Sequence, residues 1–490
     1  MYLPQWAQAF KEPKTDIRLI RGGYYKYAVE YKYNPKKKRT DKITKHLLGK
    51  ITEDKGFIPS DKNSLKEQTF QIPRVDIKIY GVSRLFCELL ADDLKSLLAL
   101  FDSGIAQTLL SVAMMRFAYQ CPLKRIPYLH AHDYCSLDWA ISGLDDKKIT
   151  ATLRFVGENR NKLVAWMKTR TGMSESADDN FVMIDSTHIQ SLSENIHINA
   201  KGYNPQHNYD PQIRLMYIMS AQLKQPVYYR LINGNITDVT SMKKCVVEFG
   251  VQNVVFIGDK GFYSKQNTDD LQANSLYYII PLFRNNKLID FKPLQKANFK
   301  QEIKKYFIYQ ERIIWYYEYQ NEGQKIITYL DENLRVEEET DYLLRTKTHP
   351  DEYSEAQFYE KTHQFGTLSL VSHLPNAEVP QTIYEAYKQR NEIEIMFDAY
   401  KNFLKADKTY MQDRYVLEGW LMANFIAMIA YYRLFILLKQ AKLLSKHSPM
   451  DIVEMSKAIY KLKIGDNWSL SEITKNTIAL FKKIKIDYLT

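Results

Sequence analysis

Cysteine is scarce in this chain, and its few cysteines lack the spacing typical of a disulfide framework or a zinc site. Four occur among 490 residues, and no two are separated by the two residues of a CxxC pair. No basic stretch followed by an apolar one opens the sequence, so we expect no secretory signal. Internal repeats and low-complexity segments are also missing. The cysteine pattern favours a protein of a reducing cytosol.

Long hydrophobic runs are also rare, and a single segment, Gly419–Leu438, is apolar and long enough to span a membrane. Arg433 interrupts this run and Glu418 borders it. A central arginine costs roughly 2.5–3.5 kcal/mol on membrane-insertion scales. We therefore expect a buried helix of a globular fold and no membrane partner.

The chain is too long for one ordinary core, which predicts two or three domains. Hydrophobic residues make up 45% and charged residues 26%, so wholesale disorder is excluded. The net charge is +11, and residues 1–70 alone hold 16 basic and 8 acidic side chains. Such a balance suggests a polyanionic partner, either nucleic acid or an acidic membrane surface.

The basic N-terminal region reads as a β-hairpin. Tyr24–Tyr33 alternates aromatic or apolar residues with polar ones, and Ile43–Ile51 could return as a second strand. The turn between them carries four consecutive cations: Lys36, Lys37, Lys38 and Arg39. Two interpretations remain open for this tip, a solvated turn or a contact with phosphates.

The remaining sequence changes character several times. Residues 76–175 predict a helical domain, and 176–282 alternate short apolar strands with helices. Aromatic β-rich sequence at 283–375 interrupts that alternation, which helices resume at 376–440. A basic tail, 441–490, reads as helical. The fold class expected is an α/β core interrupted by a β-rich insertion, with a basic β subdomain at residues 1–75 and a helical domain.

Two aspartates follow short apolar strands in the α/β region. Asp185 comes after Phe181–Ile184, and Asp259 comes after Val254–Ile257. Strand ends in such folds lie at the rim of the sheet, where sites form. Two carboxylates there would repel each other unless a divalent cation joined them. The alternative is that both are ordinary strand-end or turn residues.

A predicted helix at Thr382–Leu404 adds a third acidic group. Thr382 and Glu385 have the spacing of a capping box, which places the start of the helix there. At about 100° per residue, four later residues fall within roughly 60° on one side of the helix: Tyr387, Arg390, Glu394 and Lys401. A metal ion bound to a phosphodiester suits this combination of a carboxylate with cations and a phenol. The alternative is an exposed salt-bridge stripe.

These motifs together resemble those of bacterial insertion-sequence DDE transposases. The matching pieces are Asp185-Ser186-Thr187, Asp259-Lys260-Gly261-Phe262, and a Tyr-x2-Arg-x3-Glu-x6-Lys pattern ending at Lys401. The resemblance is to the subgroup with a β insertion between the second Asp and the Glu, and it spans roughly residues 180–440. Two further phrases support it: Gly234–Asp238 and Glu418–Trp420.

This resemblance implies an RNase-H-like catalytic core with two Mg²⁺ or Mn²⁺ ions per active site, held by Asp185, Asp259 and Glu394. It also implies cleavage of DNA at the ends of an insertion sequence and transfer of the released strand to target DNA. Arg390, Lys401 and Tyr387 would hold phosphates. The partners implied are double-stranded DNA, namely terminal inverted repeats and a target, and a second copy of the chain in a synaptic complex. The place of action would be the bacterial cytoplasm, at the nucleoid.

Trp315 has two interpretations. Relatives can use a tryptophan of the insertion to fill the place of a flipped base, and Trp315 is the one tryptophan in this insertion. Ile313–Tyr316 reads equally well as the core of a strand. Two other functions stay open at this point: a metal-dependent nuclease without strand transfer, and a catalytically silent DNA-binding protein derived from a transposase.

Overall fold

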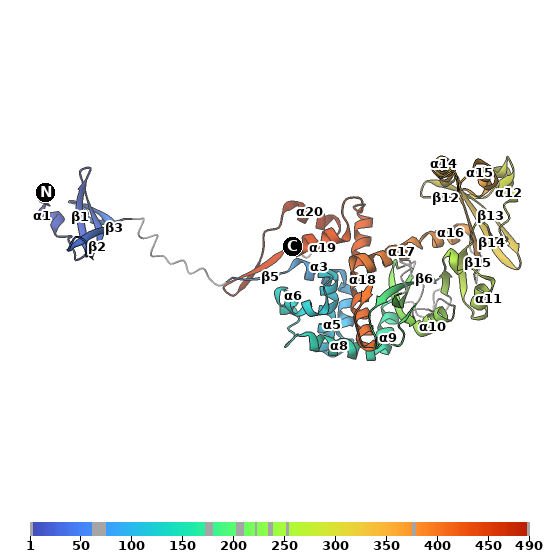
Figure 1. Cartoon of the computed structure of the whole chain (residues 1–490), viewed down its shortest axis with the longest axis horizontal. Coiled ribbons are helices and arrows are strands. Elements are labelled where there is room, and N and C mark those ends of the chain that lie inside the picture. The colour runs from blue at the N-terminus through green and yellow to red at the C-terminus, as the bar shows by residue number, and fades with distance from the viewer. Residues whose placement is uncertain are drawn as a thin grey trace. The chain divides into compact units, whose positions relative to one another are not determined.

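The computed structural model describes residues 3–60, 75–171, 180–201, 210–220, 223–233, 239–250, 254–374 and 379–487. The chain forms two compact units, which Figure 1 labels by element. The N-terminal unit comprises Met1–Asp76 with Ile464–Asn467, and the main unit comprises Ile77–Lys463 with Trp468–Thr490.

The N-terminal unit is built on an antiparallel four-stranded sheet in the order β1-β2-β3-β4. The alternation in the sequence gives the hairpin that was predicted, because β2 pairs with β3 over most of its length. Ile17, Val29 and Ile51 are buried in this unit. Its elements are α1 (Gln5–Gln8), β1 (Thr15–Ile20), β2 (Gly23–Asn34), β3 (Arg39–Thr52) and β4 (Gly56–Pro59).

A large mixed sheet organises the main unit, with strand order β12-β13-β14-β15-β11-β10-β6-β8-β7. β9 also pairs with β8, and β16 pairs with β6. β10 runs parallel to both β6 and β11, while β6, β8 and β9 are antiparallel neighbours. The core strands are β6 (Asn180–Ser191), β7 (Ala200–Lys201), β8 (Pro211–Ser220), β9 (Gln225–Asn233), β10 (Val254–Ile257), β11 (Tyr277–Pro281) and β16 (Lys408–Thr409).

The predicted bounds of β10 are confirmed, but the first predicted strand, Phe181–Ile184, was too short. β6 continues to Ser191, so Asp185 lies inside the strand and not after it. The reason is that antiparallel pairing with β8 extends from Val182 to Gln190, whereas the parallel partner β10 ends at Ile257. Asp185 therefore lies just beyond the part of β6 that pairs with β10, where β6 is still paired with β8.

Strands of the insertion continue the core sheet. β15 pairs antiparallel with β11 on one side and with β14 on the other. The segment is less purely β than predicted, because helices separate its strands. Its elements are α12 (Lys292–Gln295), α13 (Phe299–Ile303), β12 (Tyr306–Tyr309), β13 (Arg312–Asn321), β14 (Gln324–Asp331), α14 (Glu332–Thr348), α15 (Glu355–Lys361), η3 (Thr362–Gln364) and β15 (Thr367–His373).

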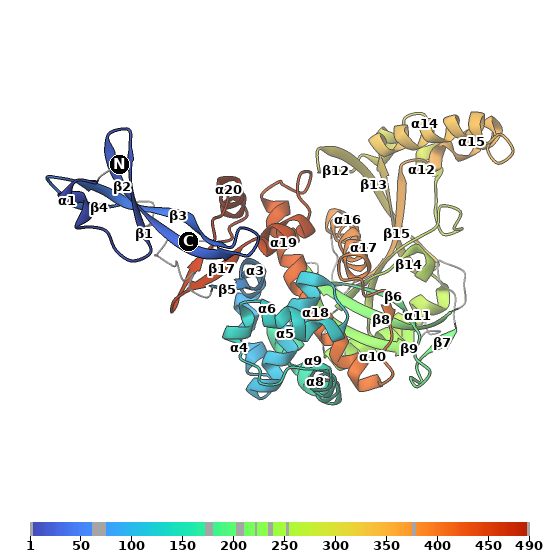
Figure 2. The same ribbon diagram turned by 60° about the vertical axis from the view of Figure 1, so that its left-hand side comes forward.

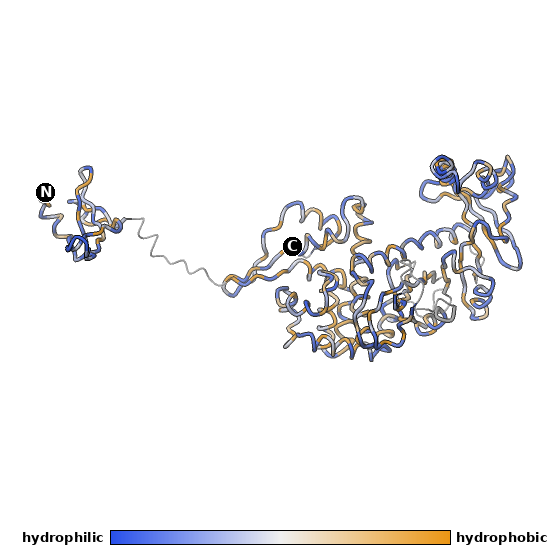
Figure 3. Tube along the Cα trace, viewed as in Figure 1, coloured by the Kyte–Doolittle hydropathy of each residue, from blue (hydrophilic) through white to orange (hydrophobic). Residues whose placement is uncertain are grey.

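Helices before and after the sheet pack into one apolar core with it. Figure 2 shows these helices beside the sheet, and Figure 3 colours the trace by the hydropathy of each residue. Helices make up most of the region 76–175 that was predicted to be helical: α3 (Gly81–Leu89), α4 (Ala91–Leu98), α5 (Ser103–Tyr119), η1 (Leu123–Arg125), α6 (Ile126–His132), α7 (Cys135–Asp138), α8 (Asp146–Glu158) and α9 (Arg160–Thr171). The others are α10 (Val239–Phe249), η2 (Lys260–Phe262), α11 (Lys265–Ala273), α16 (Pro380–Lys388), α17 (Asn391–Asp398), η4 (Ala399–Phe403), α18 (Arg414–Gln440), α19 (Pro449–Lys457) and α20 (Lys475–Lys483).

The long apolar helix α18 is the centre of this core. By length and composition it could cross a membrane, yet 72% of its most apolar window is buried inside the fold. Arg433, the residue that argued against a span, pairs with Asp93 at 2.7 Å. The expectation of a buried helix is confirmed.

Close packing explains the Glu418-Gly419-Trp420 phrase at the start of α18. A Cβ atom on Gly419 would lie 2.1 Å from the carbonyl oxygen of Leu153 in α8. Likewise, a Cβ atom on Gly157 of α8 would lie 2.0 Å from the carbonyl oxygen of Tyr415 in α18. Glycine on both helices lets their backbones touch. Glu418 is buried and pairs with Arg160.

Two helix predictions need correction. Helix begins at Pro380, in α16, and the Thr382 capping box does not form, because proline at the first position starts the helix earlier than predicted. The predicted single helix is also divided: α16 ends at Lys388, α17 begins at Asn391, and the π-helical turn η4 follows.

The tail is not purely helical. β17 (Tyr460–Ile464) and β18 (Asn467–Leu470) form a hairpin that joins β5 (Val75–Ile79) in a three-stranded sheet. The turn glycine Gly465 has a φ of +63°, a conformation that glycine adopts without strain. The Gly-, Ser- and Asp-containing segment Gly172–Asn180 is predicted from its composition as a linker, and its residues 172–179 lie outside the described residues. The phrase Gly234–Asp238 also lies outside them.

Candidate active site

The strand register brings the two predicted aspartates side by side. Ile257 of β10 pairs with Met183 of β6, in parallel. Asp259 and Asp185 each lie two residues beyond a member of this pair and therefore stand at about the same level of the sheet. Each carboxylate also accepts a hydrogen bond from the next backbone N–H, Asp185 from Ser186 and Asp259 from Lys260, both at 2.7 Å. These bonds fix how the two acids point.

The third acid comes from the helix that covers this face of the sheet. Asp185 is paired with Tyr217 across β6 and β8, so both side chains lie on the same face. The Tyr217 ring contacts Phe397 of α17 and Tyr400 of η4. The face with Asp185 is thus the one that α17 covers, and α17 supplies Glu394.

Arg390 connects all three carboxylates. Its guanidinium donates to Glu394 at 2.5 Å and lies 3.6 Å from Asp185 Oδ2 and 3.7 Å from Asp259 Oδ1. The Arg390 side chain is only 13% exposed, while the acids are 35% (Asp185), 60% (Asp259) and 56% (Glu394) exposed. Three acids from separate segments therefore converge on one cation.

Shifted pKa values follow from this crowding. Burial raises the pKa of the Asp185 carboxyl, and repulsion from Asp259 and Glu394 adds to the rise. The Ser186 N–H and the Arg390 guanidinium oppose it by stabilising the charged form.

Tyr387 and Lys401 also lie near the acids; with Arg390 and Glu394 they form the stripe that was predicted on one side of the helix. Burial raises the pKa of the Tyr387 phenol, and the Asp259 and Glu394 carboxylates act in the same direction. Burial lowers the pKa of the Lys401 ammonium, while nearby carboxylates, including that of Asp185, act to raise it. The structure thus groups Tyr387, Arg390, Glu394 and Lys401, although the helix between them is not continuous.

A cavity of about 350 Å³ opens beside the two aspartates. Arg214 of β8 lines it, and sequence reasoning missed this residue. The signal was available, because Arg214 is the one charged residue in the otherwise apolar run Ile213–Met219. Burial lowers the pKa of Arg214, and the Asp185 charge opposes that shift, so the two side chains interact electrostatically.

A second, larger cavity of about 660 Å³ lies along α16 and α17 next to the insertion. Tyr309 and Tyr384 contribute aromatic rings to it. Of its two acids, Asp331 pairs with Arg312 at 3.2 Å, and Glu385 accepts a hydrogen bond from Gln381. Four cations line the same cavity: Lys224, Arg312, Lys388 and Lys439.

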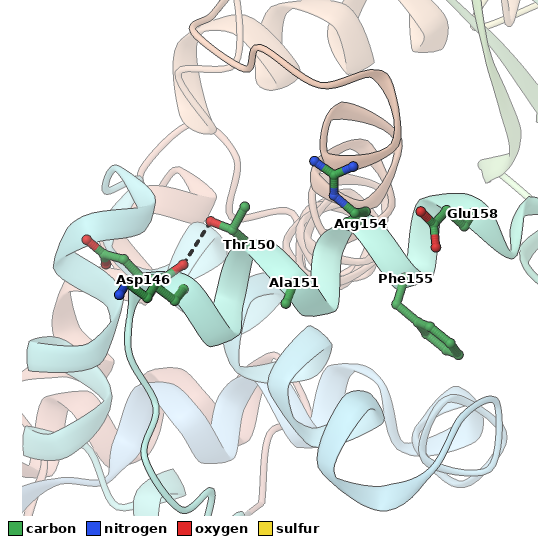
Figure 4. Close-up of a pocket in the computed structure, with 7 residues that line it drawn as sticks. Asp146, Thr150, Ala151, Arg154, Phe155 and Glu158 are labelled. Atoms are coloured by element: carbon green, nitrogen blue, oxygen red, sulfur yellow. Dashed lines mark hydrogen bonds between the residues drawn. The ribbon is translucent and has the colours of Figure 1, made fainter.

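A further pocket lies along α8 (Figure 4), lined by residues of that helix alone. Arg154 within it pairs with Asp413 at 3.1 Å. Because one helix supplies the whole lining, this pocket is an open trough without converging polar groups.

Trp315 is not brought to the acids. It is paired with Leu330 and packs against Leu294 of α12 and Ile303 of α13, on the face of the sheet that these helices cover. Its indole N–H donates to Glu332 at 3.1 Å. The neighbouring residues of β13 face α16 instead, as the Tyr316–Tyr329 and Tyr329–Tyr384 ring contacts show. Trp315 therefore points to the opposite side of the sheet from α16.

The four basic hairpin residues lie in the N-terminal unit. All of them are exposed: Lys36, Lys37 and Lys38 lie in the turn between β2 and β3, and Arg39 is the first residue of β3. The Asn34 side chain accepts hydrogen bonds from the backbone of Lys36 and Lys37. Arg39 pairs with Asp41 at 3.2 Å. The turn thus presents three lysines and one paired arginine to solvent.

The chemistry of the three acids fits a divalent cation. Carboxylate oxygens are the ligands preferred by Mg²⁺ and Mn²⁺. Among the described residues, no three His, Cys, Asp or Glu side chains already stand close enough together to hold an ion. At this site the Arg390 guanidinium lies among the three acids and keeps their carboxylates apart.

Comparison with known proteins identifies the family. Residues 176–430 match the model of the transposase DDE domain, which is more than half of the chain. The chain belongs to this family and is a DDE transposase. Such enzymes act on DNA and use divalent metal ions.

Among solved structures, the chain is similar to a piggyBac transposase synaptic complex with hairpin DNA, determined by cryo-EM. The identity is 10% and the TM-score 0.38, over 77% of this chain and 80% of that one. A comparison with curated proteins finds no match.

Proposed function

We propose that this transposase binds the ends of an insertion sequence and catalyses metal-dependent cleavage and strand transfer, moving the element by cut-and-paste. The observation that carries the proposal is the convergence of Asp185, Asp259 and Glu394 on one side of the sheet. The sheet order β9-β8-β6-β10-β11, with the first three antiparallel and the last two parallel, supports an RNase-H-like core. The Tyr-x2-Arg-x3-Glu-x6-Lys pattern supports the bacterial subgroup that carries an insertion.

Each residue has a proposed role. Asp185, Asp259 and Glu394 would hold two Mg²⁺ or Mn²⁺ ions, and when bound these ions activate the attacking oxygen and stabilise the leaving one. Arg390 can take one phosphate with both arms of its guanidinium. Lys401 adds a point charge beside Asp185, and the Tyr387 phenol can donate a hydrogen bond to a neighbouring phosphate.

The basic cavity beside α16 and α17 gives DNA a further contact surface. Its cations lie next to the stripe, and Lys388 is close enough to Lys260, the neighbour of Asp259, for the two charges to repel. We propose that DNA passes from the acids along this cavity. A homodimer on two element ends, working at the bacterial nucleoid in the cytoplasm, completes the proposal.

Cleavage and joining by defined variants test this function. The substrates are duplexes carrying the inverted repeats that flank the coding frame, and random duplexes of equal length. Asp185→Asn, Asp259→Asn and Glu394→Gln should each abolish cleavage while leaving DNA binding nearly unchanged. Asp398→Asn, an exposed acid one turn beyond Glu394, is the matched control and should cut like wild type.

Three outcomes would contradict the proposal. Full cleavage by Glu394→Gln would remove that residue from the site. Equal cleavage of random and end-containing duplexes without joining would favour a general nuclease. Binding without any cleavage by wild type would favour a silent DNA-binding protein.

The hairpin tip needs its own test, because the role of the N-terminal unit rests on its charge. If Lys36, Lys37, Lys38 and Arg39 each neutralise a phosphate, replacing all four by Ala should lower the slope of log affinity against log salt by about 0.9 per contact. An unchanged slope would make the tip a solvated turn. Lys42 and Lys45, which pair with Asp16 and Glu30, provide a matched double-Ala control.

A further inference from the structure

Arg390 occupies the place among the three acids that a cation needs. The guanidinium contacts an oxygen from β6, one from the end of β10 and one from α17. Three formal negative charges on separate segments would otherwise face each other across the site. A single positive charge, largely buried, offsets part of that repulsion.

The contacts of Arg390 differ in strength. The bond to Glu394 is short, at 2.5 Å, and joins the N-cap residue of α17 to a residue of the same helix. The approaches to Asp185 and Asp259, at 3.6 and 3.7 Å, are ion pairs longer than a hydrogen bond. Arg390 therefore neutralises the two aspartates without being locked to them.

We infer that Arg390 is a built-in counter-ion that excludes the metal until a DNA phosphate draws the guanidinium away. The inference rests on the proposed function, in which the three acids hold the metal and Arg390 binds phosphate. A phosphate offers the guanidinium two parallel charge-assisted hydrogen bonds, which the loose pairs with Asp185 and Asp259 do not provide. Departure of Arg390 leaves the acids unbalanced and ready for a divalent cation.

Metal and DNA then bind cooperatively. Each ligand removes an obstacle to the other, because DNA takes Arg390 from the acids and the metal replaces its charge. Such coupling is reciprocal, with a typical size of 5–150-fold in affinity. Without DNA the enzyme would hold little metal and would be protected from cutting where no phosphate is seated.

Titration of the full chain with Mn²⁺, with free Mn²⁺ followed by electron paramagnetic resonance, tests this inference without relying on cleavage. In the absence of DNA, Arg390→Gln should bind Mn²⁺ about tenfold more tightly than wild type. Lys401→Gln is the matched control, because it also removes one positive charge near Asp185 but not one that bridges the acids. Its gain in affinity should be clearly smaller.

A short random duplex gives the second arm of the experiment. It should raise the Mn²⁺ affinity of wild type by about tenfold and leave that of Arg390→Gln unchanged. Thermal melting provides a check on folding, since Arg390→Gln should melt below wild type without metal and regain the difference with Mn²⁺. Arg390→Lys, which keeps the charge but cannot bridge three acids, should fall between the two.

The outcomes separate this inference from the proposed function. Unchanged or weaker Mn²⁺ binding by Arg390→Gln, with binding still lost in Asp185→Asn, would overturn the counter-ion role alone. Equal gains in Arg390→Gln and Lys401→Gln would also overturn it, because general charge would explain both. Mn²⁺ binding that does not differ between Asp185→Asn and wild type would overturn the metal site and the counter-ion role together.

Discussion

Two charged clusters in the main unit differ in the ratio of acids to arginines. In the helical layer, Asp93 of α4 is 6% exposed and receives two arginines. Arg170 of α9 approaches at 3.2 Å and Arg433 of α18 at 2.7 Å. Each arginine also donates to backbone carbonyls, so this buried cluster is satisfied within the protein.

Beside the central strands β6 and β10 the ratio is reversed, because three acids share one arginine. These acids are also more exposed, and a cavity opens beside two of them. The comparison shows that a buried acid with more than one arginine partner stabilises the fold. Exposed acids that outnumber their arginine partners are instead candidates to bind a cationic ligand.

The largest expected effect breaks the buried group. Asp93→Ala leaves two arginines without their acid, and removing one partner from a buried pair costs about 3–5 kcal/mol. Urea denaturation should show a loss of that size in the free energy of unfolding. Asp92→Ala, at the exposed neighbouring position, is the control and should change little.

Glu394→Ala should behave in the opposite way, with abolished cleavage and a free energy of unfolding within about 1 kcal/mol of wild type. A strong loss of stability in Glu394→Ala, or none in Asp93→Ala, would remove the distinction between the two groups.

A second prediction uses an acid that is buried without an arginine. Asp133 is fully buried, accepts a hydrogen bond from the Cys135 N–H at 2.9 Å, and leaves Oδ2 without a hydrogen bond. Burial raises its pKa from 3.8 to about 6. The folded state therefore holds this proton more tightly than the unfolded state.

Stability contributed by Asp133 is present below about pH 4 and is lost as the pH rises to about 6. The loss amounts to about 3 kcal/mol, from 1.36 kcal/mol per pKa unit. Asp133→Asn should abolish this part of the pH dependence, measured by urea denaturation between pH 4 and 7. The exposed Asp102→Asn should keep the wild-type profile, and an unchanged profile in Asp133→Asn would contradict the assignment.

The smallest expected effect concerns the geometry of the shared cation. Arg390→Lys keeps the charge but loses the two-armed guanidinium. A misplacement of about 1 Å can cost 10²-fold in rate, or about 2.7 kcal/mol. Single-turnover cleavage of an end-containing duplex should slow by about that factor while DNA affinity changes little. Wild-type rates in this variant would reduce the stripe to a surface salt bridge.

Local patterns in the sequence were enough to predict many elements. β10 has the predicted bounds, because it is a short apolar run closed by turn residues. The hairpin of the N-terminal unit followed from simple alternation. The capping box at Thr382 failed because Pro380, which precedes it, already starts the helix.

Long-range pairing decided what local patterns could not. That Asp185 lies inside β6 depends on pairing with β8, and the level of Asp259 depends on the register of β10. The placement of Arg390 among three acids needs both registers and the turn between α16 and α17. The insertion joins the core sheet through β15 and β11, which the sequence does not signal.

The central claim is that Asp185, Asp259 and Glu394 hold the divalent metal. Anomalous diffraction from crystals of the full chain, grown with Mn²⁺ and a duplex carrying the flanking repeat, tests it most directly. The account predicts manganese peaks coordinated by oxygens of these three residues, with the Arg390 guanidinium moved onto a phosphate. Manganese peaks elsewhere, or Arg390 still bridging the three acids with DNA and metal present, would contradict it.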